Sequence, residues 1–335
     1  MHAAVIEAPG SVVVRDIPDP YPAPGEVVIA VGGCGICGTD LHLVEGSLPN
    51  TSYPLTPGHE FYGKVVEVNL PEDRPEVGAL CVGTWVAVDP NLPCGTCLPC
   101  LAGRSNLCDN YAAIGVTRAG ACAEYVAAPA SVCAPLPPDF PLEVASLIEP
   151  MSCVIHGLDR VGDRPRDGRW LVYGAGTVGL LMANAAQALT NNRVCVVETN
   201  ADRRERAASF GFRTAASAEE LDGPDWDTVV DCTGSTGAIK DGLNRVATGG
   251  TVLLFGVAAP GATVDLEPYA VYRREITIVG SMAVMNSFDR AVTALAAKPE
   301  FAAGLVTHRF ELTDYVAALD TFRSGESGKV EIVTA

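Results

Sequence analysis

The sequence is short of positive charge. Its 335 residues include 23 Lys and Arg against 40 Asp and Glu, which gives a net charge of −17 at pH 7. Lys and Arg are the residues that neutralise nucleic-acid phosphates and anionic lipid surfaces, so the composition argues against both kinds of partner. We expect no nucleic acid and no membrane among the partners of this chain.

Long apolar runs are also missing. No run approaches the roughly 18 apolar residues that a membrane span requires. The first residues, Met1–Glu7, lack the basic and apolar regions of a signal peptide. With 48% hydrophobic residues the chain is globular rather than disordered, and its length suits about two domains. We expect a cytoplasmic protein.

The twelve cysteines are the most informative part of the composition. Four of them, Cys94, Cys97, Cys100 and Cys108, lie close together in one segment. Two Cys-x-x-Cys steps and a fourth cysteine can close a tetrahedron of thiolates around a structural zinc ion, which is the interpretation we favour. Free or redox-active thiols and an iron–sulfur cluster are the alternatives for this segment.

A second set of potential ligands is spread over three segments. Cys37 lies in a glycine-rich segment, His59 and Glu60 follow Pro57-Gly58, and Glu149 precedes Pro150. One thiolate, one imidazole and one or two carboxylates suit a catalytic zinc that keeps a position open for water or substrate. A single cysteine or histidine is more often an ordinary buried residue, so spacing alone leaves this second site open.

The pattern of apolar, proline and glycine residues changes near residue 150. Before it, short Val-rich runs alternate with proline and glycine, which predicts a β-rich region. After it, apolar runs such as Trp170–Tyr173 alternate with helix-forming stretches such as Leu180–Leu189. This alternation predicts an α/β fold with a doubly wound parallel sheet. The pattern does not assign the segment from about Ser287 onward to either part.

A glycine-rich turn follows the run Trp170–Tyr173 directly and reads Gly174-Ala175-Gly176-Thr177-Val178-Gly179. Its position between a strand and a helix is the context that the dinucleotide-binding fingerprint requires. The glycines allow a tight turn and close approach of a pyrophosphate, and the helix N-terminus favours the phosphates. Glu198 ends the next strand and can accept the ribose hydroxyls of NAD. Arg203 and Arg204 could instead accept the 2′-phosphate of NADP, and we expect NAD.

Together these motifs resemble those of the zinc-dependent medium-chain alcohol and polyol dehydrogenases, in the sorbitol and threonine dehydrogenase branch. The resemblance covers essentially the whole chain, from the segment Gly-Ile-Cys-Gly-Thr-Asp-x-His to the closing Gly-Lys-Val-Glu-Ile-Val. It implies a barrel-like, GroES-like catalytic domain of residues 1–152 and 287–335. It also implies a Rossmann NAD-binding domain of residues 153–286, with the active site in the cleft between the two domains.

The resemblance also implies roles for the candidate ligands. Cys37 and His59 would bind the catalytic zinc, Glu60 would be a ligand or near-ligand, and Asp40 would orient the histidine. Glu149 stands where the classical liver-type enzymes have a second cysteine ligand. Whether it binds zinc directly or through water stays open.

Further roles concern the proton and the cofactor. The resemblance implies that Thr39 and His42 relay the proton of the substrate hydroxyl, together with the nicotinamide ribose. The segment Phe255-Gly256-Val257 would line the nicotinamide pocket.

The implied reaction is hydride transfer between NAD and a secondary alcohol, polyol or sugar-like hydroxyl, with one catalytic and one structural zinc ion. A threonine- or aminocyclitol-type dehydrogenase is the alternative within the family, the latter because residues 115–125 resemble enzymes that act on cyclitols. A zinc-stabilised binding protein without turnover is the alternative from another class. The family also implies a homodimer or homotetramer.

Overall fold

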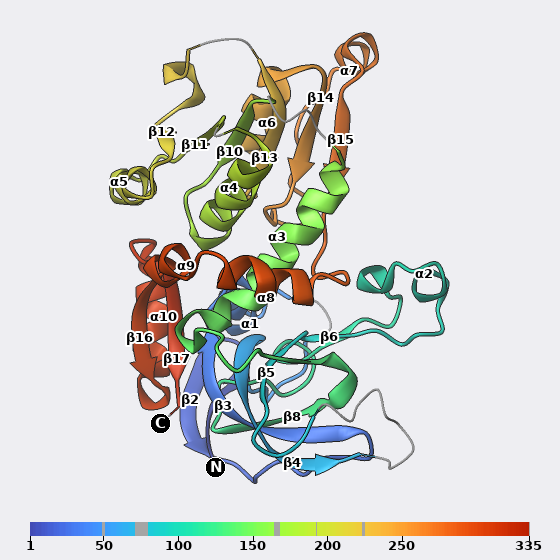
Figure 1. The fold of residues 1–335 in the computed structure, drawn as a ribbon, viewed down its shortest axis with the longest axis vertical. Coiled ribbons are helices and arrows are strands. Elements are labelled where there is room, and N and C mark those ends of the chain that lie inside the picture. Colours follow the sequence, from blue (N-terminus) through green and yellow to red (C-terminus); the bar gives the residue numbers. More distant parts are fainter. Residues whose placement is uncertain (49–50, 71–79, 164–167, 192, 223–224, 335) are drawn as a thin grey trace. The chain divides into compact units, whose positions relative to one another are not determined.

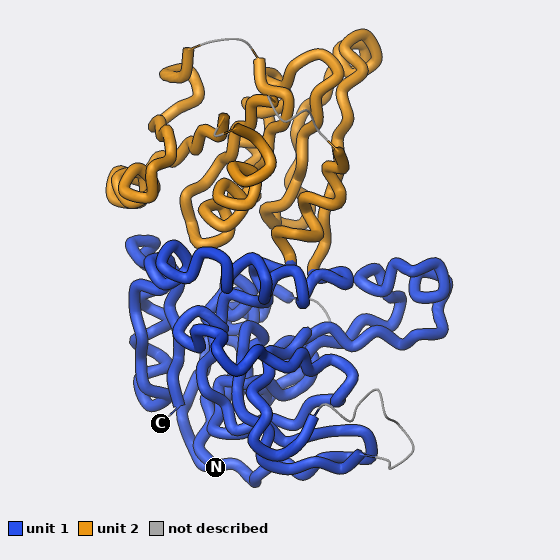
Figure 2. Tube along the Cα trace, viewed as in Figure 1, with its two compact units in different colours: residues 1–152, 284–335 blue, residues 153–283 orange. Residues whose placement is uncertain are grey.

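The structure is a computed structural model that describes residues 1–48, 51–70, 80–163, 168–191, 193–222 and 225–334. The chain divides into two compact units, which Figure 2 shows in different colours. Unit 1 consists of Met1–Ser152 and Val284–Ala335, and unit 2 consists of Cys153–Ala283. The second segment of unit 1 thus begins at Val284, whereas the resemblance places it at residue 287.

Unit 2 is built on a six-stranded sheet with the order β12-β11-β10-β13-β14-β15 (Figure 1). All neighbouring strands are parallel, which confirms the predicted α/β fold. The strands are β10 Trp170–Tyr173, β11 Val194–Val197, β12 Arg213–Ala215, β13 Trp226–Asp231, β14 Val246–Leu254 and β15 Thr277–Gly280. The helices of this unit are α4 Thr177–Leu189, α5 Ala201–Ser209, η5 Ala218–Glu220, α6 Thr236–Arg245 and α7 Pro268–Arg274.

The central strands of this sheet are buried on both faces. Every residue of β10 and β11 is buried, because helices and connecting loops pack on either side of a parallel sheet. Alternate residues such as Leu171 and Tyr173 join Val229 and Val252 in one core cluster. This burial explains why these strands are continuous apolar runs in the sequence rather than alternating ones.

Unit 1 contains a seven-stranded sheet with the order β16-β17-β3-β4-β5-β9, in which β8 also pairs with β3. Its strands are β3 Glu26–Gly35, β4 Glu60–Asn69, β5 Trp85–Val88, β8 Tyr125–Pro129, β9 Cys133–Pro135, β16 Val306–Glu311 and β17 Lys329–Val333. Strand β17 pairs antiparallel with β3, so the C-terminal segment completes the sheet of the N-terminal part. Two smaller pairs are formed by β1 His2–Ala8 with β2 Ser11–Asp16, and by β6 Asn91–Leu92 with β7 Ala112–Ala113.

The helices of unit 1 are short and connect the strands. They are α1 Gly38–Glu45, α2 Leu98–Leu101, η2 Ser105–Leu107, η3 Ala130–Val132, η4 Leu142–Leu147, α8 Phe288–Ala296, α9 Pro299–Leu305, η6 Leu312–Asp314 and α10 Tyr315–Ser324. The boundary between the units falls within α3 Ile148–Val161, after Ser152. Among the described residues, no helix is long and apolar enough to cross a membrane.

Candidate metal centres and cofactor site

Three of the predicted zinc ligands meet in unit 1. Cys37 is the N-cap of α1 just after β3, and Glu60 begins β4, directly after His59. Because Gly35 of β3 pairs with Glu60 of β4, the two strand ends bring these side chains together. One donor atom from each of the three lies within 4.8 Å of the other two.

Asp40 supports this cluster from the first turn of α1. One of its carboxylate oxygens accepts the N–H of Cys37 at 2.8 Å, and the other lies 3.9 Å from Nδ1 of His59. Both Asp40 and His59 are buried, and neither Oδ1 of Asp40 nor Nδ1 of His59 has a hydrogen-bond partner among the described residues. A carboxylate facing the second nitrogen of a ligand histidine is the usual support of a metal-binding imidazole.

The electrostatics of the cluster favour a cation. Burial lowers the pKa of His59, but its hydrogen bond with Cys37 and the charges of Asp40 and Glu60 outweigh that effect. They hold the pKa of His59 well above its usual value. A thiol, an imidazole and a carboxylate that attract positive charge into a buried site form a donor set that suits zinc.

Glu60 is itself paired with a cation that the sequence analysis missed. Lys329 of β17 forms an ion pair with Oε2 of Glu60 and donates to the carbonyl of Ile36 at 3.1 Å. Both charged side chains are buried. Burial lowers the pKa of Lys329, but the charge of Glu60 raises it above the ordinary value. Lys329 belongs to the closing Gly-Lys-Val segment, which gave no hint of its partner.

The structure does not bring Glu149 into this group. Glu149 lies half-buried in the first turn of α3. Among the described residues, the donor atoms that lie within 4.8 Å of one another at this site belong to Cys37, His59 and Glu60, and Glu149 is not among them. The charge of Glu149 contributes to the raised pKa of Lys329. Its role as a zinc ligand, directly or through water, stays a prediction.

The two predicted relay residues lie on α1. The hydroxyl of Thr39 is 3.9 Å from Sγ of Cys37, and Nδ1 of His42 is 3.2 Å from the hydroxyl of Ser47. Residues three apart on a helix share a face, so Thr39 and His42 are neighbours on α1. Their part in proton transfer stays a prediction.

The four clustered cysteines also converge, in a separate lobe of unit 1. The sulfurs of Cys94, Cys97, Cys100 and Cys108 all lie within 4.8 Å of one another. Short turns bring them together, and Cys97 caps the one-turn helix α2. The backbone N–H groups of Cys94 and Asn110 both donate to Sγ of Cys108 at 3.3 Å.

The thiols of this lobe cannot all ionise without a positive ion. Hydrogen bonds from Thr96 and from the backbone of Cys97 lower the pKa of Cys94 to about 5. Burial and the neighbouring thiols raise the pKa of Cys100 to about 12. A divalent cation offsets the repulsion between neighbouring thiolates, because four thiolates can bind one metal ion. The donor set therefore fits a structural zinc.

The glycine-rich turn in unit 2 has the geometry that its sequence predicts. Gly174 has φ +98°, and Gly179 lies so close to the carbonyl oxygen of Gly174 that a Cβ there would collide with it. The space beside Gly176 is open, with no atom within 4 Å of the position a Cβ would take. Thr177 and Val178 form the first turn of α4, whose N–H groups are available to an anion.

Glu198 is held against this turn by hydrogen bonds. Ala175 donates its N–H to Oε2 of Glu198 at 2.8 Å, and Asn200 donates to Oε1 at 2.9 Å. Arg204 is turned away from the carboxylate and donates to the backbone carbonyl of Glu198 at 2.8 Å. Arg203 lies in the first turn of α5, where its N–H is capped by Asn200. A carboxylate fixed beside the turn favours a hydroxyl and repels a phosphate.

The segment that follows β13 borders the same turn and was missed from the sequence. Phe255 and Gly256 both donate their N–H groups to the carbonyl of Asp231 at the end of β13, and Val257 is 85% exposed. The side chain of Asp231 accepts the N–H groups of Thr233 and Gly234. A Cβ on Gly174 would lie 3.0 Å from the Thr233 methyl group, so Thr233 adjoins the turn, and a Cβ on Gly234 would collide with the carbonyl oxygen of Val257.

Comparison with known proteins identifies the family. Residues 23–138 match the alcohol dehydrogenase GroES-like domain, and residues 142–331 match the glucose dehydrogenase C-terminus. The chain belongs to the zinc-dependent medium-chain alcohol dehydrogenases. Like the other members of this family, it is an oxidoreductase that acts on CH–OH groups.

Individual relatives of this dehydrogenase are similar over nearly their whole length. D-altritol 5-dehydrogenase of Agrobacterium fabrum is 33% identical, with 94% of each chain covered. L-threonine 3-dehydrogenase of a Chelativorans strain is 31% identical, over 94% of this chain and 93% of that one. A solved structure of a zinc-binding dehydrogenase from Sinorhizobium meliloti 1021, bound to NADP, is also similar, with a TM-score of 0.91. The two sequences are 31% identical, and the match covers 99% of this chain and 98% of that one.

Proposed function

We propose that this dehydrogenase oxidises a secondary hydroxyl of a polyol or sugar-like substrate with NAD, using a catalytic zinc at Cys37 and His59. The convergence of Cys37, His59 and Glu60 around one buried point is the observation that carries the proposal. A binding protein without turnover is disfavoured, because the donor cluster, Asp40 and the glycine-rich turn are all present in one chain. The similarity to D-altritol 5-dehydrogenase supports the polyol class.

The residues have distinct tasks in this reaction. Cys37 and His59 would hold the zinc ion, which would supply Lewis acidity toward a substrate hydroxyl, and the glycine-rich turn with Glu198 would hold NAD as the hydride acceptor. Asp40 holds Cys37 through its N–H, and the other Asp40 carboxylate oxygen faces Nδ1 of His59. Lys329 offsets the negative charge of Glu60. The negative charge that remains on Cys37 and Asp40 can then be balanced by a divalent ion. Thr39 and His42, together with the nicotinamide ribose, would relay the proton of the substrate hydroxyl to solvent.

The cofactor preference rests on Glu198. Both carboxylate oxygens already accept one N–H each, and each can accept one hydroxyl more. We expect Glu198→Ala to reduce the preference for NAD over NADP about tenfold, because a charge-assisted hydrogen bond is lost and the repulsion of a 2′-phosphate disappears. The measurement is kcat/KM with each cofactor, and Glu205→Ala on the exposed side of α5 is the matched control. A wild-type enzyme that already prefers NADP would contradict this assignment.

The substrate class is tested with a panel of compounds. Zinc-loaded protein is given NAD and, in turn, hexitols, pentitols, L-threonine, an aminocyclitol and a primary alcohol, and NADH formation is followed by absorbance. We expect the polyols to have the highest kcat/KM. Preference for L-threonine or the aminocyclitol would replace the polyol assignment with one of the alternatives, and no turnover of any compound would favour a binding protein. The family resemblance further supports a homodimer or homotetramer in the cytoplasm.

A further inference from the structure

Three arginines line a cavity in unit 2. Three neighbouring strands begin with an arginine at the amino edge of the sheet: Arg169 precedes β10, Arg193 precedes β11 and Arg213 begins β12. A cavity of about 270 Å³ opens between them, and the remaining described residues that line it are Val194, Cys195 and Trp226. In a chain with a net charge of −17, three guanidinium groups around one cavity are unexpected.

The sheet register places these side chains together. Trp170 pairs with Val194, and the N–H of Trp170 donates to the carbonyl of Arg193, so Arg169 and Arg193 adjoin. Cys195 pairs with Arg213. Arg193 and Cys195 are two residues apart and share a face of the sheet, so Arg193 and Arg213 lie on the same face. Burial raises the pKa of Cys195, whereas the charges of Arg213 and Arg169 lower it, so both guanidinium groups act on this thiol.

One of the three arginines is held in place by its surroundings. The guanidinium of Arg169 lies 4.1 Å from the centre of the Trp226 ring, and it donates to the carbonyl of Asp222 at 3.3 Å. The backbone N–H of Arg169 donates to the carboxylate of Asp227 at 2.7 Å. Arg193 and Arg213 are exposed, and Arg213 forms no ion pair with the described part of the chain. The three guanidinium groups line the cavity from the amino ends of three strands, where an anion could contact them together.

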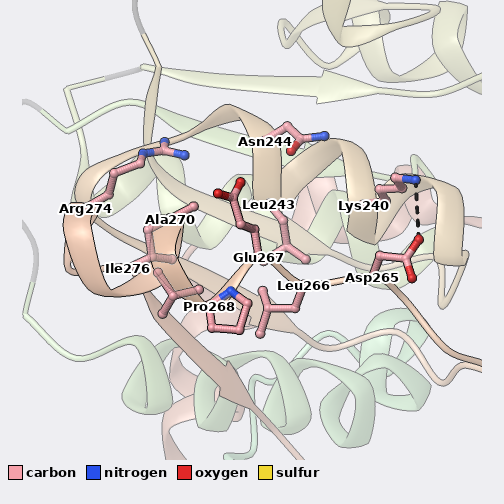
Figure 3. A pocket seen from close by; sticks show the side chains of 11 residues that line it. Lys240, Leu243, Asn244, Asp265, Leu266, Glu267, Pro268, Ala270, Arg274 and Ile276 are labelled. Atoms are coloured by element: carbon pink, nitrogen blue, oxygen red, sulfur yellow. Dashed lines mark ion pairs between the residues drawn. The ribbon is translucent and has the colours of Figure 1, made fainter.

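Another cavity of the same unit shows the opposite arrangement. It measures about 530 Å³ and lies between α6 and α7 (Figure 3). It also contains cationic side chains, but Lys240 pairs with Asp265 at 3.9 Å and Arg274 lies 3.8 Å from Asp225. Glu267 adds a further carboxylate to its lining. The described lining of the arginine cavity, in contrast, contains three arginines and no acidic residue.

We propose that the arginine cavity binds a small phosphate-bearing anion, either inorganic phosphate or the phosphate group of a phosphomonoester. Guanidinium groups match phosphate oxygens in geometry and form paired, charge-assisted hydrogen bonds with them. The volume is below the roughly 300 Å³ at which pockets for drug-sized ligands begin, so the cavity suits a phosphate group rather than a whole nucleotide.

This site is separate from the cofactor site. The glycine-rich turn and Glu198 follow the carboxyl ends of β10 and β11, whereas the arginines stand at the amino ends. Four residues of β10 separate the two edges, which corresponds to roughly 13 Å at about 3.3 Å per residue. Parallel α/β sheets bind their cofactors at the carboxyl ends of the strands. The arginine cavity lies at the opposite edge and is therefore not part of the dinucleotide site.

Calorimetric titration of the full-length, zinc-loaded protein tests the proposal. Inorganic phosphate and glucose 6-phosphate are titrated separately at constant ionic strength, with glucose as the uncharged control. We expect a Kd below about 1 mM for at least one of the two anions. Arg193→Gln and Arg213→Gln should each weaken binding about tenfold, because each removes a charge-assisted hydrogen bond. Arg273→Gln, an exposed arginine of α7 outside the cavity, is the matched control and should leave Kd unchanged.

The outcomes separate the possible sources of the anion. Tighter binding of glucose 6-phosphate than of inorganic phosphate identifies a phosphomonoester as the ligand, and the reverse order identifies free phosphate. Absence of binding, or equal weakening by Arg273→Gln, would overturn the proposal. Loss of phosphate binding in the presence of saturating NADH would also overturn it, because the anion would then occupy the cofactor site. None of these results depends on the substrate of the dehydrogenase.

Discussion

The ion pair between Lys329 and Glu60 gives the sharpest prediction for stability. Both side chains are about 97–98% buried, and Lys329 makes a second hydrogen bond to the carbonyl of Ile36. Lys329→Met leaves the Glu60 carboxylate without its partner in a buried site. Removal of one member of a buried pair costs about 3–5 kcal/mol of unfolding free energy. This is a large part of the roughly 5–15 kcal/mol that stabilises a typical protein.

The assay is urea unfolding followed by tryptophan fluorescence, since Trp85 on β5 adjoins β4 through its pairing with Lys64. The double variant Lys329→Met/Glu60→Gln should recover about 1–3 kcal/mol, because no buried charge is then left unpaired. The zinc-loaded single variant should lose less than the zinc-free one, because a bound cation also offsets Glu60. A loss below about 1 kcal/mol in the zinc-free single variant would refute this account of the pair.

Two further predictions concern other parts of unit 1. Arg118 pairs with Glu26 at 2.7 Å, at side chains 37% and 13% exposed, so Arg118→Gln should cost no more than about 1 kcal/mol in thermal unfolding at pH 7. Burial raises the pKa of Glu26, but Arg118 and the N–H of Ala23 lower it overall. The pair therefore stabilises the protein fully above the usual carboxyl pKa. The difference in stability between variant and wild type should vanish as the pH falls through the lowered pKa of Glu26. Cys97→Ser should remove about one zinc ion per chain and lower the unfolding temperature, whereas Cys81→Ser, at an exposed cysteine outside both clusters, should do neither. An unchanged zinc content in Cys97→Ser would contradict the structural assignment of the four-cysteine lobe.

The parts of the fold that could be predicted from the sequence are those specified locally. Trp170–Tyr173 and the turn that follows it were predictable because a fully buried parallel strand is a continuous apolar run and the glycines follow at once. The helix α1 was not predicted, because Gly38 and Thr39 open it and its apolar residues are few. Strand β16 was not predicted either, because it carries His308 and Arg309 and is largely exposed.

The candidate sites also differ in whether their residues are close in sequence or are brought together only by the fold. The four cysteines of the lobe are close in sequence, so their convergence needs only short turns. Cys37, His59 and Glu60 converge through the pairing of β3 with β4, which spacing alone left open. The partner of Glu60 is 269 residues away, and no local pattern could have indicated Lys329. The arginine cavity depends on the order of three strands, which is a property of the folded sheet.

The most direct test of the central claim is the zinc content and activity of Cys37→Ala. Wild-type protein should contain about two zinc ions per chain. Cys37→Ala should retain about one and lose polyol oxidation by NAD, whereas Cys81→Ala should keep both zinc ions and full activity. Full activity in Cys37→Ala, or an active wild-type protein without zinc, would contradict the assignment of Cys37 and His59 to a catalytic zinc site.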